Sequence, residues 1–194
     1  MTPLSSALRS IGDSLLRESA AFALVGGLAV SARTEPRFTR DIDLAVAAST
    51  DAAAEDLTRQ LVRHGWKIDA ITEQEAVDRL ATVRLEPPSA LGTAAVVDLL
   101  FASSGIESEL VRDAESLEVL PGVVVPVATV AGLLVLKALA TSPARPQDEV
   151  DLTALVAAAS ADDREQARRL AALVIERGFH RERDLVAEVD RRFT

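Results

Sequence analysis

AFALVGGLAVSARTEPRFTRDIDLAV, residues 21–46, is the stretch that decides how this chain folds. Its apolar run Phe22–Val25 predicts a buried strand that stops at Gly26 and Gly27, and the following LAVSAR predicts the start of a helix. The closing DIDLAV predicts a second strand, which begins with two aspartates. We therefore expect a strand, a glycine turn, a helix and another strand, in that order.

The glycine pair and the two aspartates have the chemistry of a site for phosphate and metal. Glycine has no Cβ, so the backbone N–H groups of Gly26 and Gly27 can approach anionic oxygens, and the positive end of the helix adds to the attraction. Asp41 and Asp43 are two positions apart on a strand, so their carboxylates point to the same face. Neighbouring carboxylates repel each other, and a divalent cation offsets that repulsion. The stretch predicts a site for a nucleoside triphosphate and its metal ions.

These motifs resemble the polymerase-β-like nucleotidyltransferase superfamily. Its signature is a Gly-Gly or Gly-Ser turn, a spacer of about a dozen residues, and an acidic residue repeated two positions later. Leu28 departs from the pattern, because many relatives have Ser or Thr after the glycine pair and this chain lacks that hydroxyl. Within the superfamily, the segment RFTRDIDLAV is similar to the AbiEii/MenT-type branch, with matches at Arg37, Phe38, Thr39, Asp41, Ile42 and Asp43.

Two segments further along the chain extend the resemblance. Ala94–Ala102 predicts a buried strand with one charge, Asp98, and the superfamily places its third carboxylate on such a strand. The alternative is an aspartate at a strand edge, paired with an arginine. The segment LLVLKALATSPARPQDEVDLTAL, residues 133–155, resembles the family's helical pattern of a lysine, an arginine and an Asp-x-x-Asp, matched by Lys137, Arg145, Asp148 and Asp151.

Lys137 stands out even without the resemblance. The chain has 21 basic residues, and Lys67 is its one other lysine, so the use of lysine in an apolar helix favours a phosphate partner. The alternative is a lysine whose stem packs while its head reaches water. Asp148 and Asp151 follow a proline at a helix start, where carboxylates commonly complement the helix dipole. For Asp151, we weigh a catalytic role equally against two structural ones: complementing the helix dipole, or forming a salt bridge to Arg145.

Composition predicts a soluble globular protein. The chain has 194 residues, 48% hydrophobic content and no cysteine, which fits one compact unit or two small lobes in a reducing cytoplasm. The longest apolar stretch, Ala128–Ala140, is too short to span a bilayer, so no membrane association is expected. The two histidines are too few for a zinc cluster, and Trp66 is expected in the core.

Charge is spread unevenly along the chain. The net charge of -9 argues against a protein that coats nucleic acid, yet residues 1–40 carry five arginines against three acidic residues. The acidic excess lies in residues 41–161, where the proposed metal ligands are. An RNA end could reach the site along Arg33, Arg37 and Arg40, or these arginines form a solvated face.

We predict an α/β (α+β) fold with an N-terminal lobe, residues 1–126, in which helices flank a mixed sheet, and a C-terminal helical lobe, residues 127–194. Ser49 or Thr50 can cap the helix that ends at Gly65. The predicted helices are 3–20, 28–33, 51–64 and 105–113, followed by about four helices with breaks at 141–146, 160–163 and 178. The predicted strands are 22–25, 41–47, 66–71, 81–85 and 93–102, with turns at Pro87, Pro88 and Gly92 and an extended piece at 122–126.

The resemblance implies a Mg²⁺-dependent nucleotidyltransferase with a two-metal site. Asp98 would share the second metal and accept the proton of the attacking hydroxyl, and the glycine pair would hold the β- and γ-phosphates. The implied catalytic residues are Asp41, Asp43, Asp98, Lys137 and Asp148. The metal ligands are Asp41, Asp43 and Asp98, and the nucleotide-binding residues are Gly26, Gly27, Arg40 and Lys137.

The resemblance also implies an acceptor and a biological role. The acceptor would be the 3′ end of tRNA, and the chain would be the toxin of a bacterial toxin–antitoxin system, which blocks translation and is neutralised by a cognate antitoxin. A protein hydroxyl or a small molecule is the alternative acceptor. A non-catalytic module that binds a nucleotide or partner is the third hypothesis; Leu28 favours it, and the retention of the carboxylates and Lys137 opposes it.

Overall fold

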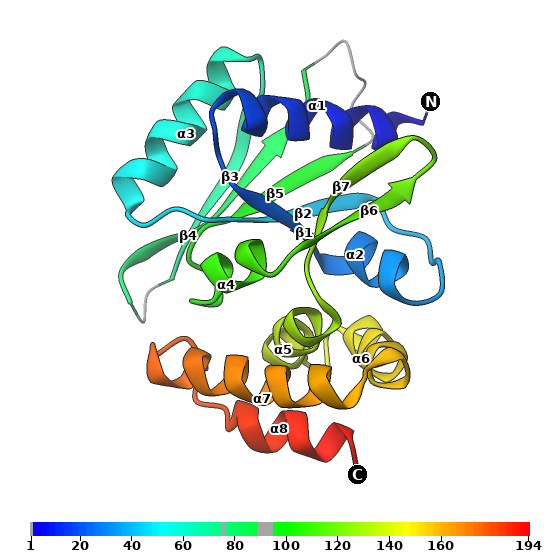
Figure 1. The fold of residues 1–194 in the computed structure, drawn as a ribbon. Helices are drawn as coiled ribbons and strands as arrows, with labels where there is room; N and C mark the ends of the chain where they lie inside the picture. The colour runs from blue at the N-terminus through cyan, green and yellow to red at the C-terminus, as the bar shows by residue number, and fades with distance from the viewer. Residues whose placement is uncertain (1, 75–76, 89–94) are drawn as a thin grey trace.

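The computed structural model describes residues 2–74, 77–88 and 95–194, and it places a β-sheet above a group of four helices (Figure 1). The helices are α1 (Pro3–Arg17), α2 (Gly26–Arg33), α3 (Asp51–Arg63), α4 (Glu107–Arg112), α5 (Val130–Ala140), α6 (Pro146–Ala158), α7 (Ala161–Glu176) and α8 (Leu185–Arg192). The strands are β1 (Phe22–Val25), β2 (Asp41–Val46), β3 (Lys67–Gln74), β4 (Arg79–Glu86), β5 (Val96–Leu100), β6 (Glu115–Leu120) and β7 (Val123–Val127).

The described strands form one mixed sheet in the order β3-β4-β5-β2-β1-β7-β6. β2 runs parallel to β5 and β1 parallel to β7, whereas the other neighbours pair antiparallel. The carboxylate-bearing strands β2 and β5 therefore lie side by side in the middle of the sheet. The predicted α/β class with a mixed, helix-flanked sheet is confirmed.

Helices cover both faces of the sheet. α1 and α3 lie on one face, while α2 and α4 lie on the other, between the sheet and the four C-terminal helices (Figure 1). Leu8, Ile11 and Leu15 recur at helical spacing in α1 and are fully buried. The Thr50 hydroxyl accepts a hydrogen bond from the Ala53 N–H at the start of α3, which confirms one of the two predicted caps. Trp66 is buried, as predicted.

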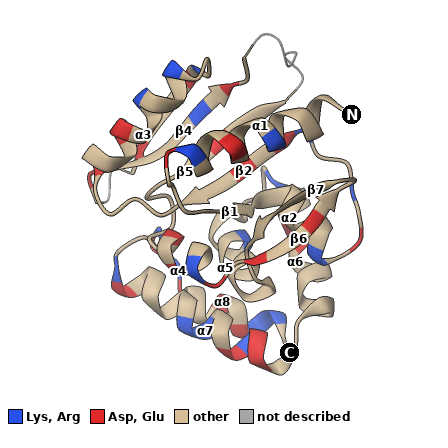
Figure 2. Ribbon diagram, turned by 45° about the horizontal axis from the view of Figure 1, so that its top comes forward, with Lys and Arg blue, Asp and Glu red and all other residues tan. Residues whose placement is uncertain are grey.

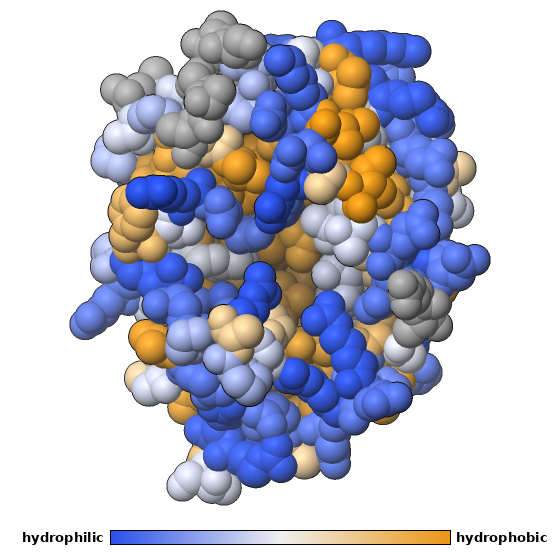
Figure 3. Space-filling view, turned by 180° about the vertical axis from the view of Figure 1, so that it is seen from behind, coloured by the Kyte–Doolittle hydropathy of each residue, from blue (hydrophilic) through white to orange (hydrophobic). Residues whose placement is uncertain are grey.

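Four helices, α5 to α8, follow the last strand. α5 is the most apolar of them, and it packs against α2, α6, α7 and α8. One cluster of buried side chains runs from the sheet into these helices, so the two parts share a core. Figure 3 shows the molecule from behind as hollowed between its upper and lower halves, with hydrophilic side chains around the hollow.

The sheet has one strand that the sequence analysis did not predict. β6 is exposed along most of its length at the sheet edge, where it pairs with β7, so its sequence ESLEVL lacks the clear alternation of a half-buried strand. The extended piece predicted at 122–126 is β7, and Val127 belongs to that strand rather than to a helix. The predicted turn at Gly92 and residues 93 and 94 of the predicted strand lie outside the described residues.

Charged residues are frequent on the outer helices. Acidic and basic segments alternate along α3, α7 and α8, while β1 is free of charge (Figure 2). In the part of the chain that the structure describes, no helix has the length and apolar character needed to cross a membrane.

Candidate functional site

Four neighbouring strands place a row of functional groups across the sheet. Val25 on β1 is opposite Asp43 on β2, Asp43 is opposite Asp98 on β5, and Asp98 is opposite Arg84 on β4. Since Asp41 is two residues before Asp43, its side chain lies on the same face of the sheet. The sheet register thus brings the three predicted carboxylates together, although they are up to 57 positions apart in the sequence.

Gly26 ends the row, because it follows Val25 directly. Its φ is +66°, and a Cβ at this position would lie 1.9 Å from Oδ2 of Asp43. A Cβ at Gly27 would lie 2.6 Å from Nη2 of Arg37. Gly26 is therefore required by its φ and by the close approach of Asp43, whereas a Cβ at Gly27 would meet only the far end of the Arg37 side chain. Helix α2 begins directly beside the carboxylates.

Asp43 is the carboxylate most affected by this arrangement. Burial, followed by the charges of Asp98 and Asp41, raises the pKa of Asp43 to about 6. Lys137 and Arg145 act in the opposite direction. Charge repulsion in this part of the cleft favours a bound cation.

The three aspartates have the oxygen-donor chemistry that Mg²⁺ prefers. Their present positions, however, do not form a closed ligand set, because no group of three acidic, histidine or cysteine side chains among the described residues is arranged to hold a metal ion. Asp98 also has another partner: Nε and Nη2 of Arg84 each donate a hydrogen bond of 2.8 Å to its carboxylate. The donors fit the metal, while one of them is held by an arginine.

Lys137 faces the row from α5 and belongs to a network of ion pairs. Its Nζ lies 2.7 Å from Oδ1 of Asp148 and 2.8 Å from Oδ2 of Asp151, both on α6. Asp148 is 6% exposed, and its Oδ2 atom has no hydrogen-bond partner among the described residues. Buried carboxylate oxygens are usually hydrogen-bonded, commonly to an ordered water.

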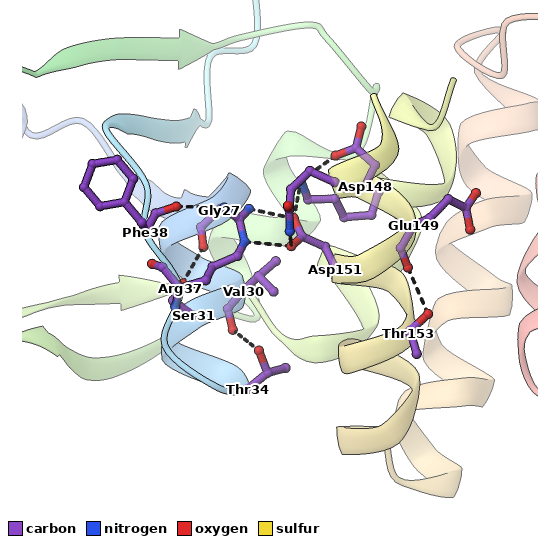
Figure 4. Close-up of polar contacts among 12 residues, drawn as sticks. Gly27, Val30, Ser31, Thr34, Arg37, Phe38, Asp148, Glu149, Asp151 and Thr153 are labelled. Atoms are coloured by element: carbon purple, nitrogen blue, oxygen red, sulfur yellow. Dashed lines mark hydrogen bonds and ion pairs between the residues drawn. The ribbon is translucent and has the colours of Figure 1, made fainter. Parts of the chain in front are cut away.

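Asp151 joins α6 to the loop before β2. Nε and Nη2 of Arg37 donate hydrogen bonds of 2.7 and 2.8 Å to its carboxylate, drawn as dashed lines in Figure 4. Burial raises the pKa of Asp151, yet the hydrogen bonds from Arg37 and Lys137 outweigh it and hold the pKa below its ordinary value. The alternative of a salt bridge between Asp151 and Arg145 was wrong, because Arg37 takes that place from the other side of the cleft.

A cleft of about 520 Å³ contains these groups, and two arginines of the C-terminal helices line it as well. Arg145 precedes α6, and Arg181 lies in the turn after α7. Burial, then the charges of Arg183 and Arg145, lowers the pKa of Arg181, so this guanidinium favours an anionic neighbour. The sequence analysis missed Arg181, since nothing in the sequence around it indicates that the chain turns back to the cleft.

The arginines that precede β2 have separate environments. Arg33 donates hydrogen bonds to the backbone oxygens of Val127 and Ala128 and is not part of a solvated face. Arg37 and Thr39 line the cleft, whereas Arg40 lies outside its lining and stacks 5.2 Å over the ring of Phe38. The ring of Phe38 points away from the ion-pair network (Figure 4) and is 78% exposed. Nucleotide binding by Arg40 stays a prediction.

Comparison with protein families identifies one match. The model described as nucleotidyl transferase AbiEii toxin, type IV TA system, matches residues 7–193 of this chain. No curated protein matches the sequence.

Three solved structures share the fold at low sequence identity. An antigenic nucleotidyltransferase-like protein from Paracoccidioides brasiliensis aligns with a TM-score of 0.54 and 18% identity, covering 96% of this chain and 92% of that chain. The antibiotic-resistance factor ANT(2″)-Ia aligns with a TM-score of 0.54 and 17% identity, covering 89% and 91%. The lincosamide antibiotic adenylyltransferase LnuA, bound to lincomycin, aligns with a TM-score of 0.50 and 15% identity, covering 79% and 97%.

Proposed function

This chain belongs to the AbiEii family of nucleotidyl transferase toxins, and from that premise we propose that it transfers a nucleoside monophosphate from an NTP to the 3′ end of tRNA. The family makes the chain a nucleotidyltransferase of a toxin–antitoxin system. The choice of acceptor, the use of Mg²⁺ and the block of translation are the proposed parts.

The row of groups across four strands is the observation that carries the proposal. It places Asp43 and Asp98 beside each other and sets the start of α2 directly against them. An NTP brings negative oxygens and needs backbone donors, cations and metal-binding carboxylates around them. The cleft offers all three between the central strands of the sheet and the facing helices.

We assign the binding of the triphosphate to the glycine turn and to cationic side chains. The N–H groups at Gly26 and Gly27 would hold the β- and γ-phosphates, since these positions leave no Cβ between the backbone and a ligand. Lys137, on the facing helix, supplies a compact ammonium. Arg145 and Arg181 line the same cleft and are placed to neutralise further phosphate charge.

The carboxylates would hold Mg²⁺ and prepare the acceptor. Asp41, Asp43 and Asp98 are the proposed ligands, and the bound metal stabilises the entering and leaving oxygens of the transferred phosphoryl group. Asp98 would accept the proton of the attacking hydroxyl. Asp148 keeps Lys137 in place through their 2.7 Å ion pair.

The acceptor and the block of translation are proposed by resemblance to the family. A nucleotide added to the 3′ end of tRNA prevents aminoacylation, so translation would stop, and a cognate antitoxin would be needed to restore growth. The site would act in the cytoplasm, where tRNA and NTPs are available.

The proposed reaction is tested by following the transfer of a labelled nucleotide. The purified protein is incubated with total bacterial tRNA, Mg²⁺ and each labelled NTP in turn, beside Asp41→Ala and Lys137→Ala. We expect labelled tRNA from the wild-type protein and none from either variant.

Two other outcomes would replace the proposal. Label on a protein or a small molecule, with none on tRNA, would move the acceptor to the classes acted on by other nucleotidyltransferases. NTP binding without release of pyrophosphate, whatever the acceptor, would indicate a binding module.

A further inference from the structure

Arg84 has a position that the proposed reaction does not explain. It extends from β4 at the end of the functional row and lines the cleft. Its guanidinium donates to both carboxylate oxygens of Asp98 at 2.8 Å, which is the planar two-bond geometry of the strongest arginine–carboxylate pairs. Asp98 is a proposed metal ligand, so Arg84 occupies the oxygens that a metal would use.

The pair engages one of the proposed metal ligands. The Asp98 side chain is 13% exposed and fully engaged by Arg84, while no closed set of three ligands exists among the described residues. The two hydrogen bonds from Arg84 use two of the about four lone-pair sites of the Asp98 carboxylate, and the positive charge of the guanidinium opposes a cation bound at the others. Metal binding at Asp98 should therefore be easier when Arg84 moves away.

Arg84 can move without disturbing the core. Its side chain is 46% exposed, and β4 alternates between buried odd-numbered positions and accessible even-numbered ones near this residue. In the metal-free protein the guanidinium is an opposite charge paired directly with Asp98, which lies one strand away from Asp43. The Arg84–Asp98 pair therefore stabilises the metal-free site and opposes metal binding.

We infer that Arg84 is an internal counter-cation that holds Asp98 in the metal-free protein and competes with the divalent metal for it. This inference rests on the proposed function in one respect, namely that Asp98 is a metal ligand. Arg84 is thus a positioning residue: it sets how readily the metal binds.

The test measures metal binding without nucleotide, acceptor or turnover. Mn²⁺ is titrated into chelator-treated protein, and the free ion is followed by electron paramagnetic resonance for the wild type, Arg84→Met and Arg84→Lys. We expect Arg84→Met to bind Mn²⁺ about 5- to 10-fold more tightly, since it removes a half-exposed, charge-assisted pair. Arg84→Lys keeps the charge and loses the planar geometry, so its affinity should lie between the other two.

Arg79→Met is the matched control. Arg79 lies on the same strand and donates a 2.6 Å hydrogen bond to Asp51 on α3, so its loss also removes an arginine–aspartate pair from β4. Arg79 is outside the lining of the cleft, so the Arg79→Met variant should bind Mn²⁺ with the affinity of the wild type.

The outcomes separate the two hypotheses. Equal or weaker Mn²⁺ binding by Arg84→Met would overturn the counter-cation role and leave the metal site standing. Mn²⁺ binding by none of the proteins would overturn both the metal part of the proposed function and this inference.

A measurement on the wild-type protein covers the case in which Arg84→Met does not fold. The Nε–H resonance of Arg84 should shift when Mg²⁺ is added, because its hydrogen bond to Asp98 is lost. An unchanged resonance at saturating Mg²⁺ would refute the competition.

Discussion

Asp43→Asn removes one negative charge from the carboxylate row while keeping the size of the side chain. Burial and the neighbouring aspartates raise the pKa of Asp43 from 3.8 to about 6 in the folded protein. Ionising this group therefore costs the folded state about 3 kcal/mol more than it costs the unfolded chain. The variant avoids that cost and should lose nucleotidyl transfer, because a proposed metal ligand is gone.

The sign of the pH dependence follows from the raised pKa. Below pH 3.8 Asp43 is protonated in both states, and its full contribution to stability is present. As the pH rises toward and through about 6, the unfolded chain releases the proton more readily, so the wild-type protein loses that stability. In metal-free buffer at pH 8 we expect Asp43→Asn to be more stable by up to about 3 kcal/mol, or about 6–12 °C in Tm.

The assay is thermal and urea unfolding of both proteins in chelating buffer from pH 5 to pH 8. The difference should grow with pH and shrink when Mg²⁺ is added, since the metal offsets the repulsion in the wild type. Asp13→Asn, an exposed carboxylate on α1, is the control and should show neither trend. A variant no more stable than the wild type at pH 8, or a difference that is constant with pH, would refute the electrostatic argument.

Three further substitutions test the geometry of the site. Gly26→Ala forces a Cβ to 1.9 Å from a carboxylate oxygen at a φ of +66°, so it should abolish transfer and lower the free energy of unfolding by about 1–3 kcal/mol. The control is Gly12→Ala, where a Cβ would lie 3.7 Å from the nearest atom; this variant should be neutral or stabilising in urea melts. Lys137→Met leaves two buried carboxylates with fewer partners, so it should abolish transfer and lower the free energy of unfolding by about 3–5 kcal/mol. Lys67→Met, at an exposed strand position, should change neither transfer nor stability. Equal losses in the two variants would contradict the phosphate and ion-pair role of Lys137. Phe38→Ala should leave the Tm unchanged within about 0.5 kcal/mol of stability because the ring is 78% exposed, and a large loss would show that it packs.

Local patterns were sufficient for the first half of the site. The apolar run before Gly26 and the alternation after Asp41 predicted β1 and β2 at nearly their observed bounds, and Thr50 was one of two caps predicted from their place before the next helix. Each of these signals lies within a few residues of the feature it predicts. The four C-terminal helices were also predictable, because their breaks contain turn residues or capping side chains.

The partners of the charged groups were not predictable in the same way. For Asp98, pairing with an arginine was one of two alternatives, and the sequence does not say that Arg84 would be that arginine until the register of β4 against β5 is known. The pair of Arg37 and Asp151 joins residues 114 positions apart. Such contacts depend on tertiary packing, which periodicity and spacing do not encode.

The ion pair between Arg37 and Asp151 indicates how the activity of this protein could be placed under external control. It joins the loop before β2 to a helix of the C-terminal group, and the buried cluster crosses the same boundary. A chain cut in the short connection between Val127 and Val130 would leave each fragment with exposed apolar surface and a divided cleft. Two such fragments, fused to proteins that associate on demand, would stay inert apart and regain the complete cleft when brought together.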